Sequence, residues 1–274
     1  DKGYFNPDML LHLPVKYEKL KKLPLSLAKK LVFSDPYACA IFQHERMCDI
    51  GVAQNFRVEM AKYNCDEEFA KKLAYDSTFD RVVIFGLGTT GLFIGEQIRR
   101  NHKTAKILFV ARSSEKSDKA EFVKNDLNAE YMSTSGMSSG KIAENIINML
   151  GGAASVFVGT SGTNIEHKIA FEYGVLGCNG IYDSFSLGPE VTYDTMTFGF
   201  KNQVIFASIN FTQKHMEEAI NILCESKFDM LVELIEKAEF TADPVLAYEN
   251  KIYSKGAPLK TAVIWNKEYI DEGK

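Results

Sequence analysis

The sequence has few cysteines, and they follow no recognisable pattern. Its 274 residues include five cysteines, an odd number, at wide and irregular spacings with no Cys-x-x-Cys pair. This argues against a disulfide framework and against a closed zinc site built from cysteines. Because free thiols persist in reducing compartments, the sequence favours a cytoplasmic protein.

Long apolar runs and an excess of positive charge are also missing. No apolar stretch approaches the roughly 18 residues of a membrane-spanning helix, and the first residues lack the pattern of a signal peptide. The net charge of -4 and the dispersed lysines provide no basic field for a phosphate backbone. We therefore expect neither a membrane nor a nucleic-acid partner. The chain does not begin with Met, which is typical of a processed product or of part of a longer chain.

Strand and helix patterns alternate through the middle of the chain. Strand patterns occur at Arg81–Phe85, Lys106–Ala111, Ala154–Gly159, Gly180–Tyr182 and Gln203–Ile209. Helical patterns occur at Leu92–Arg100, Asp118–Asn125, Lys141–Leu150, Asn164–Glu172 and Gln213–Cys224. This order predicts an α/β fold with a doubly wound, parallel, Rossmann-type sheet.

Three segments stand outside that alternation. Asp8–Pro14 has a strand-like pattern, and Leu259–Trp265 is a second extended run near the other end. We interpret the two flanks as halves of a second, incomplete lobe. Met47–Phe79 is charged and helix-prone, and its pattern favours a solvated helical insertion.

A glycine motif joins the first predicted strand of the sheet to its first helix. Gly86, Gly88 and Gly91, with Thr89 and Thr90 between them, form a Gly-x-Gly-x-x-Gly pattern. The three glycines would allow a tight turn, the approach of a pyrophosphate to the backbone, and close packing of helix and strand. Because the motif has both the strand and the helix around it, we predict a dinucleotide site. A glycine turn without a ligand is the alternative.

The end of the next predicted strand indicates which dinucleotide binds. NAD enzymes usually place an acidic side chain there for the ribose hydroxyls, but this sequence has Arg112 and Ser113. A guanidinium can bind a 2′-phosphate bidentately, whereas a carboxylate would repel it. We therefore predict NADP(H), the alternative being that Arg112 is an ordinary surface residue.

The order of segments from about Asp8 to Trp265 resembles the medium-chain dehydrogenase/reductase superfamily, in particular its sorbitol, threonine and archaeal glucose dehydrogenases. The resemblance is carried by Ser34–Ala40, Gly86–Gly91, Val156–Gly162, Gly177–Tyr182, Ala207–Asn210 and His215–Ala219. Only the glycine motif is specific by itself. The resemblance implies an NADP(H)-dependent oxidoreductase that transfers hydride to or from a sugar, a polyol or a related alcohol or ketone.

The resemblance also implies roles for individual residues. Thr160 and Ser161 would lie near the nicotinamide ribose, Tyr182 on a loop above the cofactor, and Ser208 and Asn210 beside the nicotinamide or the substrate. Simpler readings stay open: a helix cap for Thr160 and Ser161, a partly buried ring for Tyr182, and a turn for Asn210. Family members commonly form dimers through the last sheet strand, so a homo-oligomer is expected.

Full-length relatives begin with a β-rich catalytic lobe that supplies zinc ligands, and most of that lobe is absent from this sequence. The resemblance thus divides the chain into a lobe remnant at 1–33, a Rossmann domain at 34–225 and a return into the lobe at 226–274. No metal site is expected, and zinc would enter only with ligands from the missing lobe. Asp35 is interpreted as the N-cap of the linking helix and His44 as a packed or exposed helix residue.

Other functional classes lack their motifs. The sequence has no helical Tyr-x-x-x-Lys pair downstream of the glycines, and Gly140-Lys141 is followed by Ile142 rather than Ser or Thr. These absences argue against a short-chain dehydrogenase and a P-loop protein. The alternatives that stay open are a non-catalytic NADPH-binding or interaction module and the cofactor domain of a larger enzyme. No catalytic residue can be named from the sequence.

Overall fold

The computed structural model describes residues 21–186, 188, 190–225, 240–241, 262–263, 268 and 270–271. The chain divides into two compact units, one formed by Ala40–Ile209 and the other by Asp1–Cys39 together with Asn210–Lys274. The first unit is shorter at both ends than the predicted domain 34–225.

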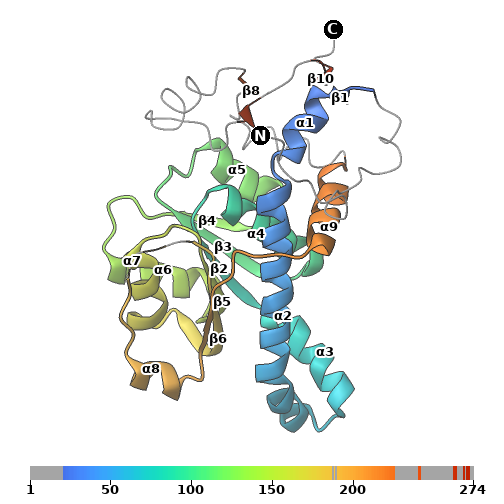
Figure 1. Ribbon diagram of the computed structural model, residues 1–274. Helices are drawn as coiled ribbons and strands as arrows, with labels where there is room; N and C mark the ends of the chain where they lie inside the picture. Colours follow the sequence, from blue (N-terminus) through green and yellow to red (C-terminus); the bar gives the residue numbers. More distant parts are fainter. Residues whose placement is uncertain are drawn as a thin grey trace. The chain divides into compact units, whose positions relative to one another are not determined.

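The unit Ala40–Ile209 is built around a six-stranded sheet in the order β4-β3-β2-β5-β6-β7 (Figure 1). Its strands are β2 (Arg81–Phe85), β3 (Lys106–Ala111), β4 (Glu130–Ser133), β5 (Ala154–Gly159), β6 (Leu176–Ser184) and β7 (Val204–Phe206). All neighbouring strands pair in parallel. This confirms the predicted α/β fold with a doubly wound parallel sheet.

Helices cover both faces of this sheet. They are α3 (Glu67–Thr78), α4 (Thr89–Asn101), α5 (Asp118–Asn125), α6 (Ser139–Leu150), α7 (Asn164–His167), the π-helical segment η3 (Lys168–Glu172) and α8 (Thr195–Phe200), together with most of α2 (Ser34–Tyr63). The helices α6 and η3 pack on one face, in a core that includes Val83, Leu108 and Phe157. On the other face Gly95 of α4 lies against Ile84 and Phe109. Because successive strand residues point to opposite faces, both faces of β2 and β3 are apolar and buried.

Local sequence signals explain where the helices begin and end. Ser117 and Ser138 cap α5 and α6 by accepting hydrogen bonds from the backbone N–H groups three residues further on, those of Ala120 and Lys141. Gly151 ends α6 in a left-handed conformation, at φ 71°. Short loops between the capped helices and the strands thus fix the winding of the sheet.

Several predicted boundaries need correction. The strand predicted at Gly180–Tyr182 extends over Leu176–Ser184, whereas the one predicted to run to Ile209 ends at Phe206. The helix predicted at Asn164–Glu172 is α-helical only to His167 and then π-helical. The sequence analysis missed β4 and α8, because neither has a continuous apolar run or a strong amphipathic pattern.

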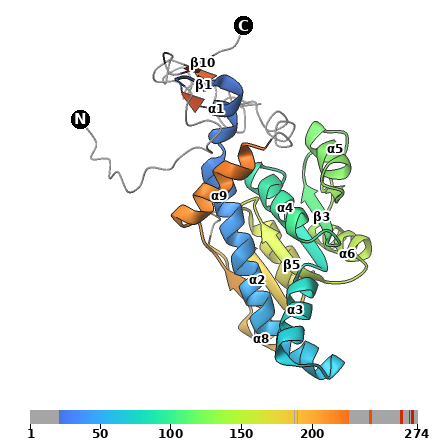
Figure 2. The same cartoon turned by 90° about the vertical axis from the view of Figure 1, so that its right-hand side faces the viewer.

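The prediction of a solvated insertion at Met47–Phe79 is wrong in part. This stretch forms the second half of α2 and the whole of α3, which lie side by side in all views (Figures 1 and 2). Met47, Ala70, Ala74 and Phe79 are buried. The charged residues therefore form the outer face of a helical pair that packs through its apolar face.

The second unit has a small apolar core in its described part. The helix α1 (Leu25–Leu31) and the helix α9 (Gln213–Leu223) contribute Leu27 and Ile220 to this core, beside Cys224. The described part of this unit also contains two parallel strand pairs. In one, β1 (Leu23–Pro24) pairs with β10 (Ile270–Asp271), and in the other β8 (Phe240–Thr241) pairs with β9 (Ala262–Val263).

The predictions for the flanks fall largely outside the described residues. The segment Asp8–Pro14 is not among them, and only Ala262–Val263 of the run Leu259–Trp265 is described. Among the described helices, none combines the length and the apolar character that crossing a membrane requires.

Candidate cofactor site

The glycine motif lies where β2 ends and α4 begins, at the carboxyl edge of the sheet. Gly86 follows β2 directly, and Gly88 is the N-cap of α4. The chain crosses from β4 to β5 on the far side of β2, so the winding reverses between β2 and β5 at this point. Open α/β sheets bind ligands at such a switch point, and the free N–H groups of a helix amino end favour phosphate.

Two of the three glycines are required by the packing of the protein itself. Gly86 has a φ of +134°, and a side chain there would collide with the hydroxyl of Thr160. A methyl group on Gly91 would lie 2.7 Å from the carbonyl oxygen of Gly86. Any side chain at these two positions would therefore strain the turn, with or without a ligand.

Gly88 differs from both. Its φ of -89° suits any residue, and a Cβ atom there would meet nothing within 4 Å. Packing within the described chain therefore gives no reason for glycine at this position. The empty space beside Gly88, next to the amino end of α4 and the half-buried Thr89 and Thr90, fits a pyrophosphate that approaches the backbone.

Arg112 and Ser113 follow β3, the neighbour of β2. Phe85 at the end of β2 is in register with Val110, so Arg112 lies just beyond the same edge. Both residues are exposed. The Arg112 side chain has no ion-pair or hydrogen-bond partner in the part of the chain that the structure describes. Its guanidinium is thus available to an anion, while the Ser113 carbonyl accepts a hydrogen bond from the Tyr131 hydroxyl at 2.7 Å.

Thr160 and Ser161 follow β5, on the other side of the switch point. The Thr160 hydroxyl donates to the carbonyl of Phe85 at 3.0 Å and so ties the ends of β5 and β2 together. The backbone N–H and the hydroxyl of Ser161 both donate to Glu166, at 3.0 and 2.6 Å. Both predicted residues therefore lie at the site, but their hydroxyls already have protein partners.

Glu166 is a buried carboxylate that the sequence analysis missed. It accepts hydrogen bonds from Ser161 and, at 3.2 Å, from the Ser186 hydroxyl, and it thereby links the loops after β5 and β6. Burial raises the pKa of its carboxyl, and the hydrogen bonds from Ser161 oppose that rise. A single glutamate in a short helix gives no sequence signal, because its partners come from two separate loops.

The prediction for Tyr182 is wrong in its placement. Tyr182 lies inside β6 rather than on a loop, and it is fully buried. Its ring stacks on Phe157 and contacts His167 and Phe171. Burial raises the pKa of its hydroxyl above the ordinary value. Tyr182 is therefore a core residue beneath the edge.

Ser208 and Asn210 follow β7. Ser208 is half-buried, and its carbonyl accepts a hydrogen bond from the Gln43 side chain. Asn210 is exposed and is the first residue of the other compact unit's second segment. The role predicted for Asn210 stays a prediction. Further along, Asp35 is in the first turn of α2, which begins at Ser34, so Asp35 is not the N-cap.

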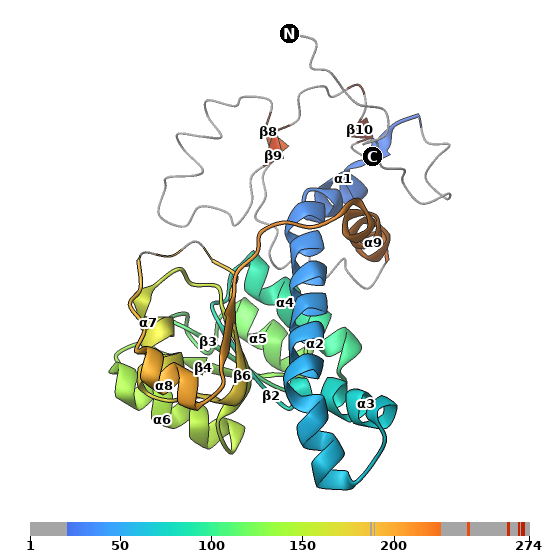
Figure 3. The same cartoon turned by 60° about the horizontal axis from the view of Figure 1, so that its bottom comes forward.

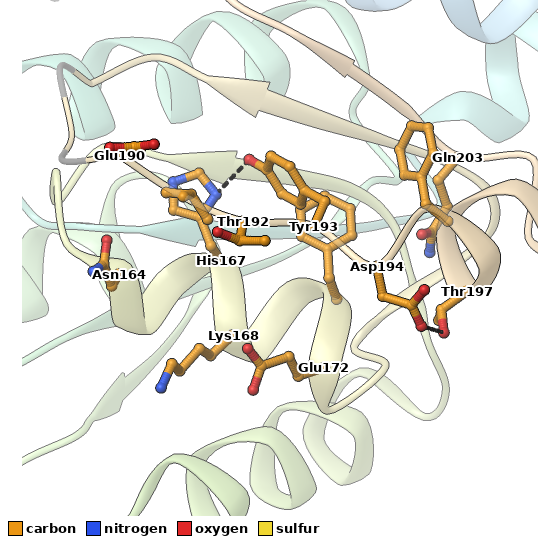
Figure 4. Close-up of a pocket in the computed structure, with 13 residues that line it drawn as sticks. Asn164, His167, Lys168, Glu172, Glu190, Thr192, Tyr193, Asp194, Thr197 and Gln203 are labelled. Carbon is orange, nitrogen blue, oxygen red and sulfur yellow. Dashed lines mark hydrogen bonds between the residues drawn. The ribbon is translucent and has the colours of Figure 1, made fainter.

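A cavity of about 620 Å³ lies apart from the glycine motif. It lies along α7 and η3, opposite the segment 190–194 and α8, as Figure 4 shows. His167 and Tyr193 both line it and form a hydrogen bond, with 2.9 Å between the imidazole Nδ1 and the phenol oxygen. Burial lowers the pKa of His167 and raises that of Tyr193, so both are neutral near pH 7. The cavity thus offers a neutral polar pair beside the site rather than the phosphate-binding groups.

Groups that could hold a metal ion are absent from this edge among the described residues. The described His, Cys, Asp and Glu side chains come together as a possible ligand set at His44, Cys48 and His102, which lie at the opposite edge of the sheet. His44, interpreted from the sequence as a packed or exposed helix residue, is buried.

Comparison with known proteins finds similar folds among solved structures. No protein-family model and no curated protein matches the sequence. Among solved structures, glucose dehydrogenase from Haloferax mediterranei has a TM-score of 0.59 and 13% identity over 94% of this chain and 63% of that one. The same enzyme in complex with NADP, Zn and gluconolactone has a TM-score of 0.58 and 11% identity over 93% and 62%.

A further similar structure is 2R,3R-butanediol dehydrogenase from Bacillus subtilis, with a TM-score of 0.58 and 14% identity over 85% of this chain and 57% of that one. The chain thus spans less than two thirds of the length of each of these proteins. At identities this low, the structural similarity establishes the fold alone. The fold was the central prediction from the sequence. The chain has a Rossmann-type α/β fold similar to the fold of these dehydrogenases.

Proposed function

We propose that the unit Ala40–Ile209 binds NADP(H) at the carboxyl edge of its sheet and serves hydride transfer to or from a sugar, a polyol or a related alcohol or ketone. The open space at Gly88 is the observation that carries the proposal, because Gly86 and Gly91 are explained by packing and Gly88 is not. The similarity to a glucose dehydrogenase in complex with NADP supports it.

Each part of the cofactor has a matching group on this edge. The amino end of α4, with Gly88, Thr89 and Thr90, would bind the pyrophosphate through backbone N–H groups. Arg112 and Ser113 would bind the 2′-phosphate through a bidentate guanidinium contact and a hydroxyl.

The far half of the cofactor would lie across the switch point. Thr160 and Ser161, held in place by Phe85 and Glu166, would border the nicotinamide ribose. Ser208 and Asn210 would lie beside the nicotinamide or the substrate. When bound, the cofactor supplies or accepts the hydride, and these residues position it and keep its reactive face fixed.

The zinc that such an enzyme uses is not assigned to residues of this chain. The described residues bring no ligand set to the carboxyl edge, so the zinc ligands would come from elsewhere in the protein. Assembly as a homodimer through β7 is also proposed, because β7 is one of the two edge strands of the described sheet. A non-catalytic NADPH-binding module is the alternative, and it has the same cofactor site without turnover.

Titration with NADPH and NADH, followed by nicotinamide fluorescence, tests the proposal. We expect NADPH to bind at least about tenfold more tightly than NADH, since a charge-assisted phosphate contact contributes about 1.5–3 kcal/mol. Arg112→Ala should weaken NADPH binding about tenfold to a hundredfold and leave NADH binding unchanged. Lys103→Ala removes an exposed cation at the opposite edge and should change neither affinity.

The outcomes separate the parts of the proposal. Equal affinities for NADPH and NADH would overturn the role of Arg112 and keep the dinucleotide site. Binding of neither nucleotide would overturn the site itself. Oxidation of NADPH with a panel of sugars and ketones, by the chain in its full natural length, distinguishes the enzyme from the binding module.

A further inference from the structure

Three potential metal ligands meet inside the protein at the amino edge of the sheet. The Nε2 atoms of His44 and His102 are 3.0 Å apart, and the Cys48 sulfur is 3.6 Å from the His44 Nε2. All three donor atoms lie within 4.8 Å of one another. Each side chain is at least nine-tenths buried, with exposures of 5, 7 and 9% for His44, His102 and Cys48.

Two secondary-structure elements bring these residues together. His44 and Cys48 are four residues apart on α2, so their side chains lie on one face of the helix. His102 is the C-cap of α4, 58 residues after His44. The spacing within α2 is common and the third residue is remote, which explains why the sequence analysis expected no metal site.

The distances are close to those between the ligands of a bound metal ion. Zinc in proteins has Zn–N distances of about 2.0–2.1 Å and Zn–S distances of about 2.3 Å. Tetrahedral geometry then separates two nitrogens by about 3.3 Å and a nitrogen from a sulfur by about 3.6 Å. The Cys48–His44 distance of 3.6 Å equals the second value, and the His44–His102 distance of 3.0 Å is somewhat shorter than the first.

The surroundings favour a metal rather than a charged pair. Phe79 packs against both imidazoles, with ring centroids 5.3 Å from His44 and 4.1 Å from His102. A neutral imidazole has a free lone pair that a metal ion can take, and the apolar packing around both rings disfavours their charged form. Tyr75, in α3, contacts the His102 ring and hydrogen-bonds the Cys48 thiol.

A cavity connects this cluster with the outside. It has a volume of about 470 Å³, and Cys48 and Tyr75 line it together with Asp49 and Glu67. Asp49 provides negative charge in the cavity, whereas the Glu67 carboxylate is paired with Lys71, which also lines it. The cavity also leaves room for a water molecule at the sulfur side of the cluster.

We propose that His44, Cys48 and His102 form a zinc site, with a water molecule from the cavity as the fourth ligand. Binding replaces the thiol proton of Cys48 with the metal, and the proton leaves through the cavity to solvent. Both imidazoles bind through Nε2 and carry their proton on Nδ1. The site joins α2, α4 and, through Tyr75, α3.

This site is distinct from the proposed cofactor site. The helix α4 has 13 residues, so about 20 Å separates its amino end at Gly88 from His102 at its other end. A metal there could not contact the reacting end of a nucleotide at the glycine motif. Its role is to hold helices together, and it does not depend on NADP(H) binding.

Zinc analysis of the purified chain tests the proposal. After saturation with zinc and dialysis against metal-free buffer, we expect about one zinc per chain and a raised midpoint of thermal unfolding. Cys48→Ser and His102→Asn should each lower the zinc content at least tenfold. Cys65→Ser, which removes a half-buried thiol outside the cluster, should leave it unchanged.

Cobalt substitution keeps the proposal testable if the variants do not fold. Cobalt bound to the natural chain should show a thiolate-to-metal charge-transfer band and the visible bands of a four-coordinate site. Zinc below about 0.1 per chain, retention of zinc by Cys48→Ser, or a cobalt spectrum without a thiolate band would each overturn the proposal. Preferential binding of copper(I) over zinc at the same three residues would overturn the choice of metal.

Discussion

The two ends of α4 lie in opposite kinds of surroundings. At its amino end the chain omits side chains, and Gly88 opens onto free space beside exposed Arg112. At its carboxyl end His102 is enclosed by His44, Phe79 and Tyr75. The sheet thus has open space at one edge and aromatic rings at the other (Figure 3 shows α4 beside α2). Room for a ligand is created by omitting side chains, whereas the filled edge requires particular side chains from distant segments.

The largest expected effect comes from adding a side chain at Gly91, where the packing of the turn requires glycine. Gly91→Val would place a branched side chain against the Gly86 carbonyl, and we expect it to destabilise the protein by at least about 3 kcal/mol. Thermal unfolding should shift down by roughly 5 °C or more, and NADPH binding should be lost. An unchanged midpoint would show that α4 does not approach β2 as closely as described.

Gly88→Val is the matched change at the position where nothing packs. Because its Cβ would meet no protein atom, we expect a midpoint of unfolding within about 2 °C of the unmodified chain. The side chain would occupy the pyrophosphate position, so NADPH and NADH should both bind about tenfold to a hundredfold more weakly. Full affinity for both nucleotides would mean that the open space at Gly88 is not where they bind.

These two edges also differ in how far the sequence predicted them. The glycine motif is contiguous and lies between a strand and a helix, so the turn, the switch point and the positions of Arg112 and Thr160 follow from local patterns. Tyr182 could not be placed correctly, because the extent of β6 depends on its pairing with β5 and β7 rather than on its own pattern.

The filled edge was beyond prediction for a different reason. His44 and Cys48 share a helix face, but His102 joins them only through the packing of α2 against the end of α4. Glu166 was missed in the same way, since Ser161 and Ser186 reach it from separate loops. Local patterns predict which elements form, whereas side-chain groups assembled from several elements become visible only in the fold.

Asp183 belongs to neither edge of the sheet, because it is a polar residue buried inside it. It lies in β6 between Val158 and Phe206, fully buried, and neither carboxyl oxygen has a hydrogen-bond partner among the described residues. Burial raises the pKa of its carboxyl well above the ordinary 3.8. The folded protein therefore keeps a proton on Asp183 that the unfolded chain releases above about pH 4.

The smallest expected effect follows from that proton. Since the folded state binds the proton more tightly, the contribution of Asp183 to stability falls as pH rises from about 4 towards its folded pKa, by at most about 1.4 kcal/mol per pH unit. Asp183→Asn removes the titration, so its free energy of unfolding, measured with urea at pH 5 and pH 6, should fall less over that interval than that of the unmodified chain. Asp194→Asn is the control, because the pKa of this exposed carboxyl is lowered by the Thr197 hydroxyl and its titration lies below the interval. Equal pH slopes for the unmodified chain and Asp183→Asn would contradict this prediction. They would show that the Asp183 carboxylate has a partner or that water reaches it inside the sheet.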